Sequence, residues 1–112
     1  MQAKHYLPIL SLGFSLTACQ SFNLPWNQDN DPQAETFVRA GDYVHAMQRY
    51  SQLAQTRSNP DHYWLLAADA GLRAGDDSAA RNMARSIRPR ELTKEELTRY
   101  NLLTSRLDLN AG

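Results

Sequence analysis

Few side chains in this 112-residue chain could do chemistry, and their spacing limits what that chemistry could be. A single cysteine, Cys19, excludes an intrachain disulfide and a zinc site built from several cysteines. His45 and His62 have no histidine or carboxylate at metal-ligand spacing on a shared helix face, and His45 is expected to face solvent. The serines have no evident base partner, and glycine-rich phosphate loops are absent from the sequence. We therefore predict a protein that is not an enzyme and uses no cofactor, metal or small-molecule substrate.

The segment before Cys19 is typical of a secretory signal. Lys4 gives a short basic start, and an apolar run over residues 6–16 leads into small residues. Since a transmembrane helix needs about 20 apolar residues, this run is too short to span a bilayer, and Pro8 interrupts it. We expect a cleaved leader, not a membrane-spanning anchor.

The residues at 16–19, Leu-Thr-Ala-Cys, resemble the lipobox of bacterial lipoproteins. In that family the cysteine thiol is alkylated with a diacylglyceryl group, the chain is cut before it, and the new amino terminus is acylated. The resemblance implies a signal peptide at 1–18 and lipidation at Cys19; a free thiol behind an ordinary signal is the alternative. Acyl chains contribute about 0.8 kcal/mol per buried methylene, so several chains hold a protein firmly to a membrane. Gln20 stands where an aspartate would resemble an inner-membrane retention signal, which favours the periplasmic face of the outer membrane.

Residues 20–30 carry no helical or alternating period and are rich in turn formers, so we expect 19–30 to be a flexible tether. Phe22 and Trp26 would either lie at the level of the lipid headgroups or cap the first pair of helices. The 12 basic and 12 acidic side chains cancel, which leaves no net positive field to hold a nucleic acid.

From residue 31 onward the chain repeats itself. The tetrapeptide Arg-Ala-Gly-Asp at 39–42 recurs at 73–76, a separation of 34 positions, which is the tetratricopeptide period. A weaker echo, Asn-Ala-Gly, occupies 110–112 after a longer spacing. The repeat predicts an all-α domain over 31–112, in which antiparallel helix hairpins stack as a tetratricopeptide-like solenoid of about two and a half repeats, open at its C-terminal end.

Capping residues mark where the helices begin. Asp31 and Asn59 each stand before a proline, which places a capping side chain ahead of a residue whose missing N–H costs nothing at the first helical position. Thr93 and Glu96 form a capping box, in which each side chain satisfies a backbone N–H of the other.

Glycines mark where helices end. Gly41 and Gly75 can take the left-handed conformation that terminates a helix, and Asp42 and either Asp76 or Asp77 then begin the next one. A turn is expected at 88–91, Arg-Pro-Arg-Glu. The predicted helices cover 32–40, 43–56, 60–74, 77–87 and 94–109.

Apolar residues at helical spacing predict a core stripe on three of these helices. The stripe residues are Tyr43, Ala46, Met47, Tyr50, Leu53 and Ala54 on the second helix, Ala80, Met83, Ala84 and Ile87 on the fourth, and Leu97, Tyr100, Leu103, Thr104 and Leu107 on the fifth. Ala67 and Gly71 stand where the tetratricopeptide pattern prefers leucine and tyrosine, which predicts a looser second repeat. We expect either a longer protein or a partner chain to cover the Leu103 and Leu107 face.

These features together resemble the amino-terminal region of the LpoA (LppC) family of outer-membrane lipoproteins. The residues that carry the resemblance include Tyr63, Trp64, Leu65, Leu66, Ala67, Ala68, Gly71, Leu72, Ala74, Gly75, Asp76, Ala80, Leu92, Thr93, Leu102, Leu103, Arg106, Leu107 and Leu109. In that family a helical-repeat stalk leads to a larger carboxy-terminal domain, which is assigned the contact with a class A penicillin-binding protein. The resemblance implies a binding or regulatory module that supports peptidoglycan synthesis by this enzyme.

The alternative function is a tetratricopeptide scaffold lipoprotein for outer-membrane protein or pilus secretin assembly. Either way the partner is a protein of the periplasm. Arg81, Arg85 and Arg88 follow one another at i, i+4 and i+7 and predict a ridge near a helix C-terminus, where the macrodipole stabilises each cation by about 0.3–1 kcal/mol. The ridge is also a candidate contact for an acidic partner surface or an anionic wall polymer.

Overall fold

The computed structural model describes residues 31–111, and over this range the chain is all-α, as the repeat spacing predicted. No strand occurs within these residues. The predicted lipidation site Cys19, the signal peptide at 1–18 and the tether at 19–30 lie outside the described residues.

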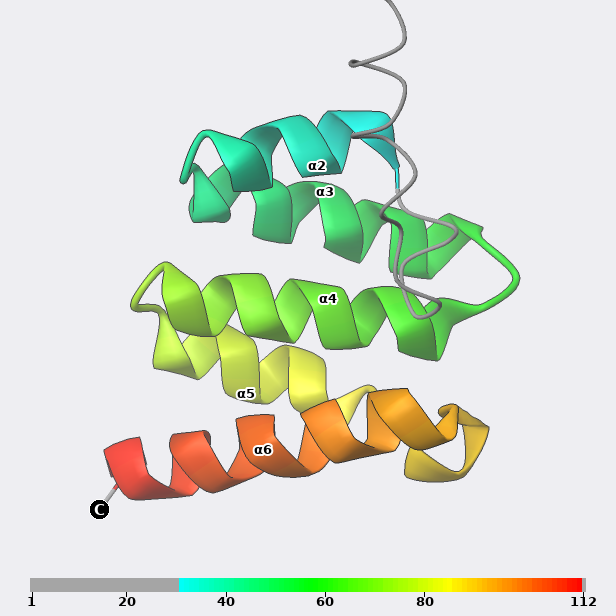
Figure 1. The fold of residues 1–112 in the computed structure, drawn as a ribbon, viewed down its shortest axis with the longest axis vertical. Helices are drawn as coiled ribbons and strands as arrows, with labels where there is room; N and C mark the ends of the chain where they lie inside the picture. The colour runs from blue at the N-terminus through cyan, green and yellow to red at the C-terminus, as the bar shows by residue number, and fades with distance from the viewer. Residues whose placement is uncertain (1–30, 112) are drawn as a thin grey trace, which may run out of the picture.

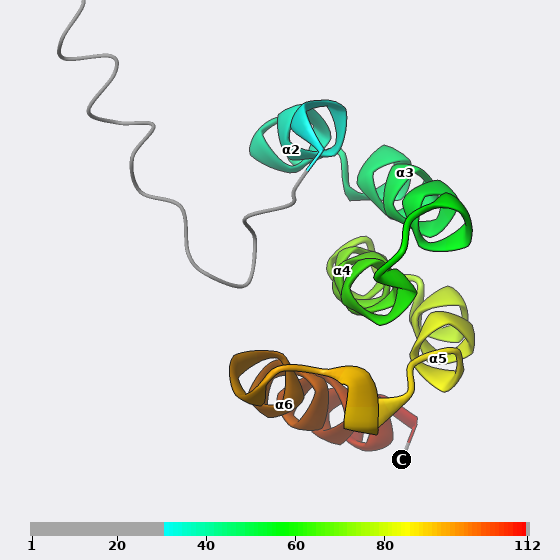
Figure 2. The same ribbon diagram turned by 90° about the vertical axis from the view of Figure 1, so that its right-hand side faces the viewer.

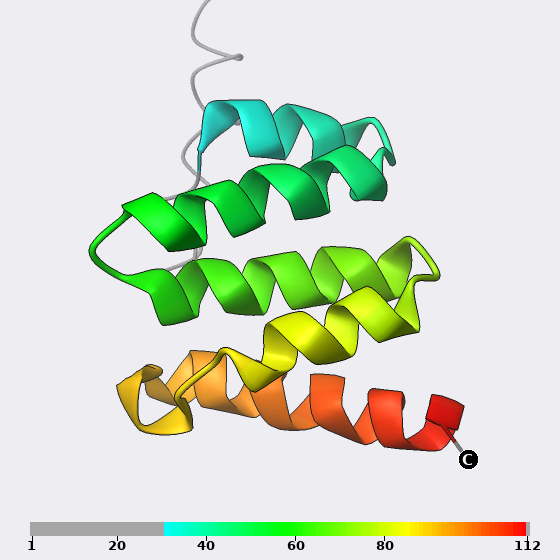
Figure 3. The same ribbon diagram turned by 180° about the vertical axis from the view of Figure 1, so that it is seen from behind.

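Consecutive helices run antiparallel and stack in chain order (Figures 1 and 3). Seen nearly along the helix axes, α2, α4 and α6 lie on one side of the stack, and α3 and α5 lie on the other (Figure 2). The elements are α2 (Pro32–Arg39), α3 (Tyr43–Thr56), α4 (Pro60–Arg73), α5 (Asp77–Arg85), the 3-10 helix η3 (Pro89–Glu91) and α6 (Lys94–Ala111). This zigzag gives each helix a neighbour on which to bury its apolar face.

Two helix reversals share one geometry. Gly41 has φ 76° and Gly75 has φ 81°, so both adopt the predicted left-handed conformation. After the first glycine, the N–H of Asp42 donates to the carbonyl of Phe37 at 2.8 Å; after the second, the N–H of Asp76 donates to the carbonyl of Gly71 at 2.9 Å. These are the six-to-one bonds of the Schellman motif, which satisfies carbonyls at the helix end.

Most of the predicted helix starts are confirmed. The carboxylates of Asp31, Asp42 and Asp76 accept hydrogen bonds from backbone N–H groups three residues further on, so Asp76 is the N-cap of α5. The reciprocal bonds between Thr93 and Glu96 form the expected capping box. Asn59 occupies the N-cap position of α4 as predicted, but its side chain makes no capping hydrogen bond there.

Helix α5 ends two residues earlier than predicted, and the expected turn at 88–91 contains the short helix η3. Pro89 supplies the reason, since the residue before a proline avoids the helical conformation, and Arg88 is extended with φ −100° and ψ 104°. The N–H groups of Ser86 and Ile87 instead donate to carbonyls three residues back, which tightens the last turn. At the other boundaries, α2 and α4 each end one residue before the predicted position, and α6 extends to Ala111.

The core consists of two apolar clusters that meet at α4. The first joins α2, α3 and α4 around the fully buried Tyr63, and the second joins α4, α5 and α6. Most stripe residues are buried as predicted, but Leu97 is 38% exposed and is not part of the core. Leu103 and Leu107 pack within the second cluster, so the expectation that another chain must cover them was wrong.

Gly71 brings two helices close together, which contradicts the prediction of a looser second repeat. A Cβ atom at this position would lie 3.1 Å from the Met47 sulfur and 3.3 Å from the backbone nitrogen of Ala80. The missing side chain therefore lets both α5 and the Met47 side chain of α3 approach α4 closely at this position.

The first predicted outcome concerns Gly75, where substitution by alanine would force a side chain into the left-handed region. We expect Gly75→Ala to lower the free energy of unfolding by about 1 kcal/mol, and Gly75→Asn to cost less, because asparagine tolerates this conformation. Urea denaturation followed by circular dichroism measures both. Equal losses in the two variants would contradict the assignment of the effect to backbone conformation.

A second predicted outcome concerns the pH dependence that Asp31 confers. Arg49 donates to both carboxylate oxygens, at 3.0 Å each, and this hydrogen bonding lowers the pKa of Asp31 below its usual 3.8, although burial opposes the shift. Because the pKa is lower in the folded state, the resulting stability is present above about pH 4 and is lost as the pH falls through the folded-state pKa.

Asp31→Asn tests this dependence, since asparagine keeps the N-cap but removes the charge. We expect it to cost about 1–2 kcal/mol at pH 7 and progressively less below pH 4. Urea titrations at several pH values measure the difference, with Asp77→Asn as the matched control in another first turn. A cost that does not change with pH would exclude the charge as its source.

Candidate partner-binding site

The three arginines predicted as a ridge do not share one helix face. Arg81 and Arg85 lie on α5, but Arg88 lies beyond the end of that helix, because the chain becomes extended before Pro89. Arg81 donates to the carbonyl of Leu107 on α6 at 2.8 Å. Arg85 donates to the side-chain oxygen of Asn82 on its own helix at 3.0 Å. The prediction of a single arginine ridge is therefore wrong, because each of the three arginines contacts a different part of the structure.

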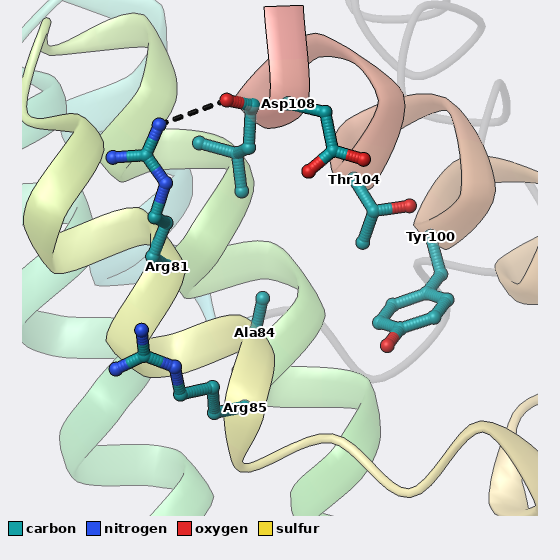
Figure 4. A pocket seen from close by; sticks show the side chains of 7 residues that line it. Arg81, Ala84, Arg85, Tyr100, Thr104 and Asp108 are labelled. Atoms are coloured by element: carbon teal, nitrogen blue, oxygen red, sulfur yellow. Dashed lines mark hydrogen bonds between the residues drawn. The ribbon is translucent and has the colours of Figure 1, made fainter. Parts of the chain in front are cut away.

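A shallow groove between α5 and α6 contains two of these arginines (Figure 4). Its volume is about 190 Å³, and its lining residues are Arg81, Ala84, Arg85, Tyr100, Thr104, Leu107 and Asp108. In Figure 4, Arg81 reaches across to the backbone of α6, whereas the Arg85 guanidinium lies away from that helix. Small-molecule sites usually enclose about 300–1,000 Å³, so this groove suits part of a protein partner better than a whole ligand.

Arg88 anchors the connection between α5 and α6 to the start of α4. Its backbone N–H donates to the Asp61 carboxylate at 2.8 Å, and its guanidinium forms an ion pair with the same carboxylate at 2.8 Å. Asp61 is only 4% exposed, and the pKa of Arg88 is raised by its hydrogen bond and charge attraction to this carboxylate. Since a buried charge without a partner is costly, Arg88 has a structural role here that sequence spacing did not reveal.

The shortest polar contact between distant residues joins α4 to α6. His62 Nδ1 lies 2.6 Å from Glu96 Oε2, and both side chains are buried. Glu96 also accepts the backbone N–H of Thr93 through its other oxygen, so one carboxylate completes a capping box and holds a second helix. The sequence carried one signal for this pair, because His62 and Glu96 are the third residues of their helices and lie 34 positions apart.

His45 lies on the exposed side of α3, as predicted. Its ring nitrogen is 2.7 Å from the carboxylate of Asp42, the N-cap of the same helix, and its ring stacks on Phe37 of α2. These contacts give His45 a role at the first helix reversal.

A second groove, which the sequence did not predict, lies between α4 and α6. Its volume is about 160 Å³. The lining residues are Leu65, Asp69, Leu72 and Arg73 on α4, and Arg99, Leu102, Leu103 and Arg106 on α6. Asp69 forms ion pairs with Arg73 at 3.0 Å and with Arg99 at 3.6 Å.

Within residues 31–111, no cluster of three or more histidine, cysteine or acidic side chains is placed to hold a metal ion. None of the helices in this range combines the length and the apolar character that crossing a membrane requires. The grooves between α5 and α6 and between α4 and α6 are candidate sites for partner binding.

Comparisons with protein-family models, with curated proteins and with solved structures find no match to this chain.

A third predicted outcome concerns the contact between α4 and α6. We expect Glu96→Ala to lower the free energy of unfolding by about 2–3 kcal/mol, because it removes a capping bond and leaves His62 buried without its partner. Glu96→Gln should cost less, since glutamine can still close the capping box. Urea denaturation measures both against Glu95→Ala, an exposed residue of the same first turn. A loss in Glu96→Ala no larger than in Glu95→Ala would show that the contact contributes nothing.

Proposed function

We propose that this chain is the helical-repeat part of a bacterial outer-membrane lipoprotein that supports peptidoglycan synthesis by a class A penicillin-binding protein. In this proposal the hairpins α2–α3 and α4–α5, followed by α6, are tetratricopeptide-like units. The observation that carries it is the recurrence of one hairpin geometry at a 34-residue spacing, with the same left-handed glycine and the same aspartate N-cap.

Buried alanines at matching positions support the repeat. Ala34 and Ala68 are both fully buried and lie 34 positions apart, and the same holds for Ala46 and Ala80. A small side chain at such positions lets two helices approach each other closely. Since each hairpin buries its apolar face against its neighbours, the stack presents long side surfaces of the kind that repeat proteins use to bind other proteins.

The lipobox at 16–19 and the polar stretch at 20–30 support the location. A lipidated Cys19 would hold the helical stack at the periplasmic face of the outer membrane, within reach of the wall. From there the stack would position contacts for the synthase, and the groove between α5 and α6, with Arg81 and Arg85, is the surface we assign to such a contact.

A fourth predicted outcome tests this function in the cells that make the protein. Cys19→Ala should leave the chain without lipid, remove it from the outer-membrane fraction and weaken its support of wall synthesis. Mass spectrometry of the purified protein measures the lipid, and incorporation of a labelled wall precursor measures synthesis. An unmodified thiol with an intact leader in the wild-type protein would refute the location.

A photo-crosslinking residue at position 85 identifies the partner. Capture of a class A penicillin-binding protein, together with faster glycan polymerisation when the purified chain is added to that enzyme, is the expected result. The matched control places the same photo-crosslinking residue at Gln48, which is exposed on α3 and outside both grooves. Capture of barrel-assembly or secretin subunits in its place would favour the scaffold function.

A further inference from the structure

The groove between α4 and α6 carries an excess of positive side chains in a chain whose charges otherwise balance. Three of its lining side chains are arginines and one is an aspartate, whereas the whole chain has no formal net charge. Asp69 is engaged by Arg73 and Arg99. Arg106 is exposed and forms no ion pair with any residue of the described range. The groove therefore offers a cation to an acidic partner.

An apolar side chain lies one helical turn from this cation. Leu102 is 62% exposed, the most exposed of the large hydrophobic residues in the described chain, and Arg106 follows it at i+4 on α6. Ala34 and Ala68, which precede Leu102 by 68 and 34 positions, are fully buried. Positions 34, 68 and 102 correspond to one another in the 34-residue repeat. The first two hold small buried alanines, whereas the third holds a large exposed leucine.

The dimensions of the groove favour a short peptide segment. The residues that line it on each helix span about two turns, or about 11 Å, which corresponds to three or four residues of extended chain. Its volume of about 160 Å³ is below the range of about 300–1,000 Å³ typical of small-molecule pockets. A segment that lies across the two helices could place one side chain in the groove and keep its backbone at the rim.

We propose that this groove binds an extended acidic peptide segment of a partner protein, with a carboxylate at Arg106 and Arg99 and an aliphatic side chain on Leu102. The positive groove in a neutral chain selects the acidic side chains, and the exposed leucine selects the aliphatic one. This binding requires neither the lipid anchor nor a class A penicillin-binding protein as the partner, so its test is independent of the function proposed above.

Fluorescence anisotropy with the purified full chain tests the groove. The probe is a labelled seven-residue peptide of alternating glutamate and leucine, and the comparison peptides carry glutamine or lysine in place of glutamate. We expect the acidic peptide to bind most tightly and to lose affinity as salt is added. Arg106→Glu and Leu102→Ser should each weaken its binding about tenfold or more, because each removes one of the two recognition contacts.

Arg90→Glu is the matched control, since it makes the same charge change on an exposed residue outside both grooves. It should alter the affinity less than about twofold. Circular dichroism confirms that each variant keeps its helices, and Arg106→Gln replaces Arg106→Glu if the charge reversal disturbs them. The proposal fails if the acidic peptide binds no better than the glutamine peptide, or if Arg90→Glu weakens binding as much as Arg106→Glu. It also fails if Arg106→Glu abolishes binding to insoluble peptidoglycan while no peptide binds, because the ligand would then be the wall polymer.

Discussion

The described fold depends on the packing around α4. This helix belongs to both apolar clusters, and nine of its fourteen residues are buried. Tyr63 is fully buried within the first cluster, and Gly71 leaves room for Met47 of α3 and the backbone of α5. Helix α4 packs against α3, α5 and α6. A larger or smaller side chain on its buried faces would therefore displace the helices on both sides of it.

Polar contacts determine how the helices are oriented relative to one another, which apolar packing alone does not determine. The outer helices are held to the stack by buried carboxylates: Asp31 binds Arg49 of α3, Asp61 binds Arg88 beyond α5, and Glu96 binds His62 of α4. Asp31 and Glu96 also accept a backbone N–H three residues away, so each stabilises a local turn and a distant contact together. Asp61 accepts the backbone N–H of Arg88, so both of its contacts hold the connection between α5 and α6. Apolar area has no preferred direction, whereas these bonds have a defined geometry.

Most of the secondary structure could be predicted from the sequence because its signals are local. Gly41, Gly75 and the aspartates that follow them determine two helix reversals through backbone conformation and a bond to the third residue ahead. The end of α5 differs from its prediction because apolar spacing continues to Ile87, whereas Pro89 holds Arg88 in an extended conformation and the last turn tightens before it. At Asn59 the residue type was suitable, but its side chain did not take the capping geometry.

The candidate site was predicted less well, because it depends on contacts between residues far apart in the chain. Arg81, Arg85 and Arg88 have the spacing of a helical ridge, but their partners are a carbonyl on α6, an amide on α5 and a carboxylate on α4. The groove between α4 and α6 joins residues from helices that are separated in sequence by α5 and η3. Only the repeat period could have indicated which positions of those helices face each other.

The contact between His62 and Glu96 has a consequence for how this sequence can change in evolution. Both residues are buried, they occupy the same position in successive helices of one side, and they contact each other through His62 Nδ1 and Glu96 Oε2. A mutation that removes either residue leaves the other polar side chain buried without a hydrogen-bond partner, which lowers stability. Replacing both with apolar residues leaves no such unpaired group. The two positions are therefore expected to be inherited as a unit, so that divergence at one selects for a compensating exchange at the other.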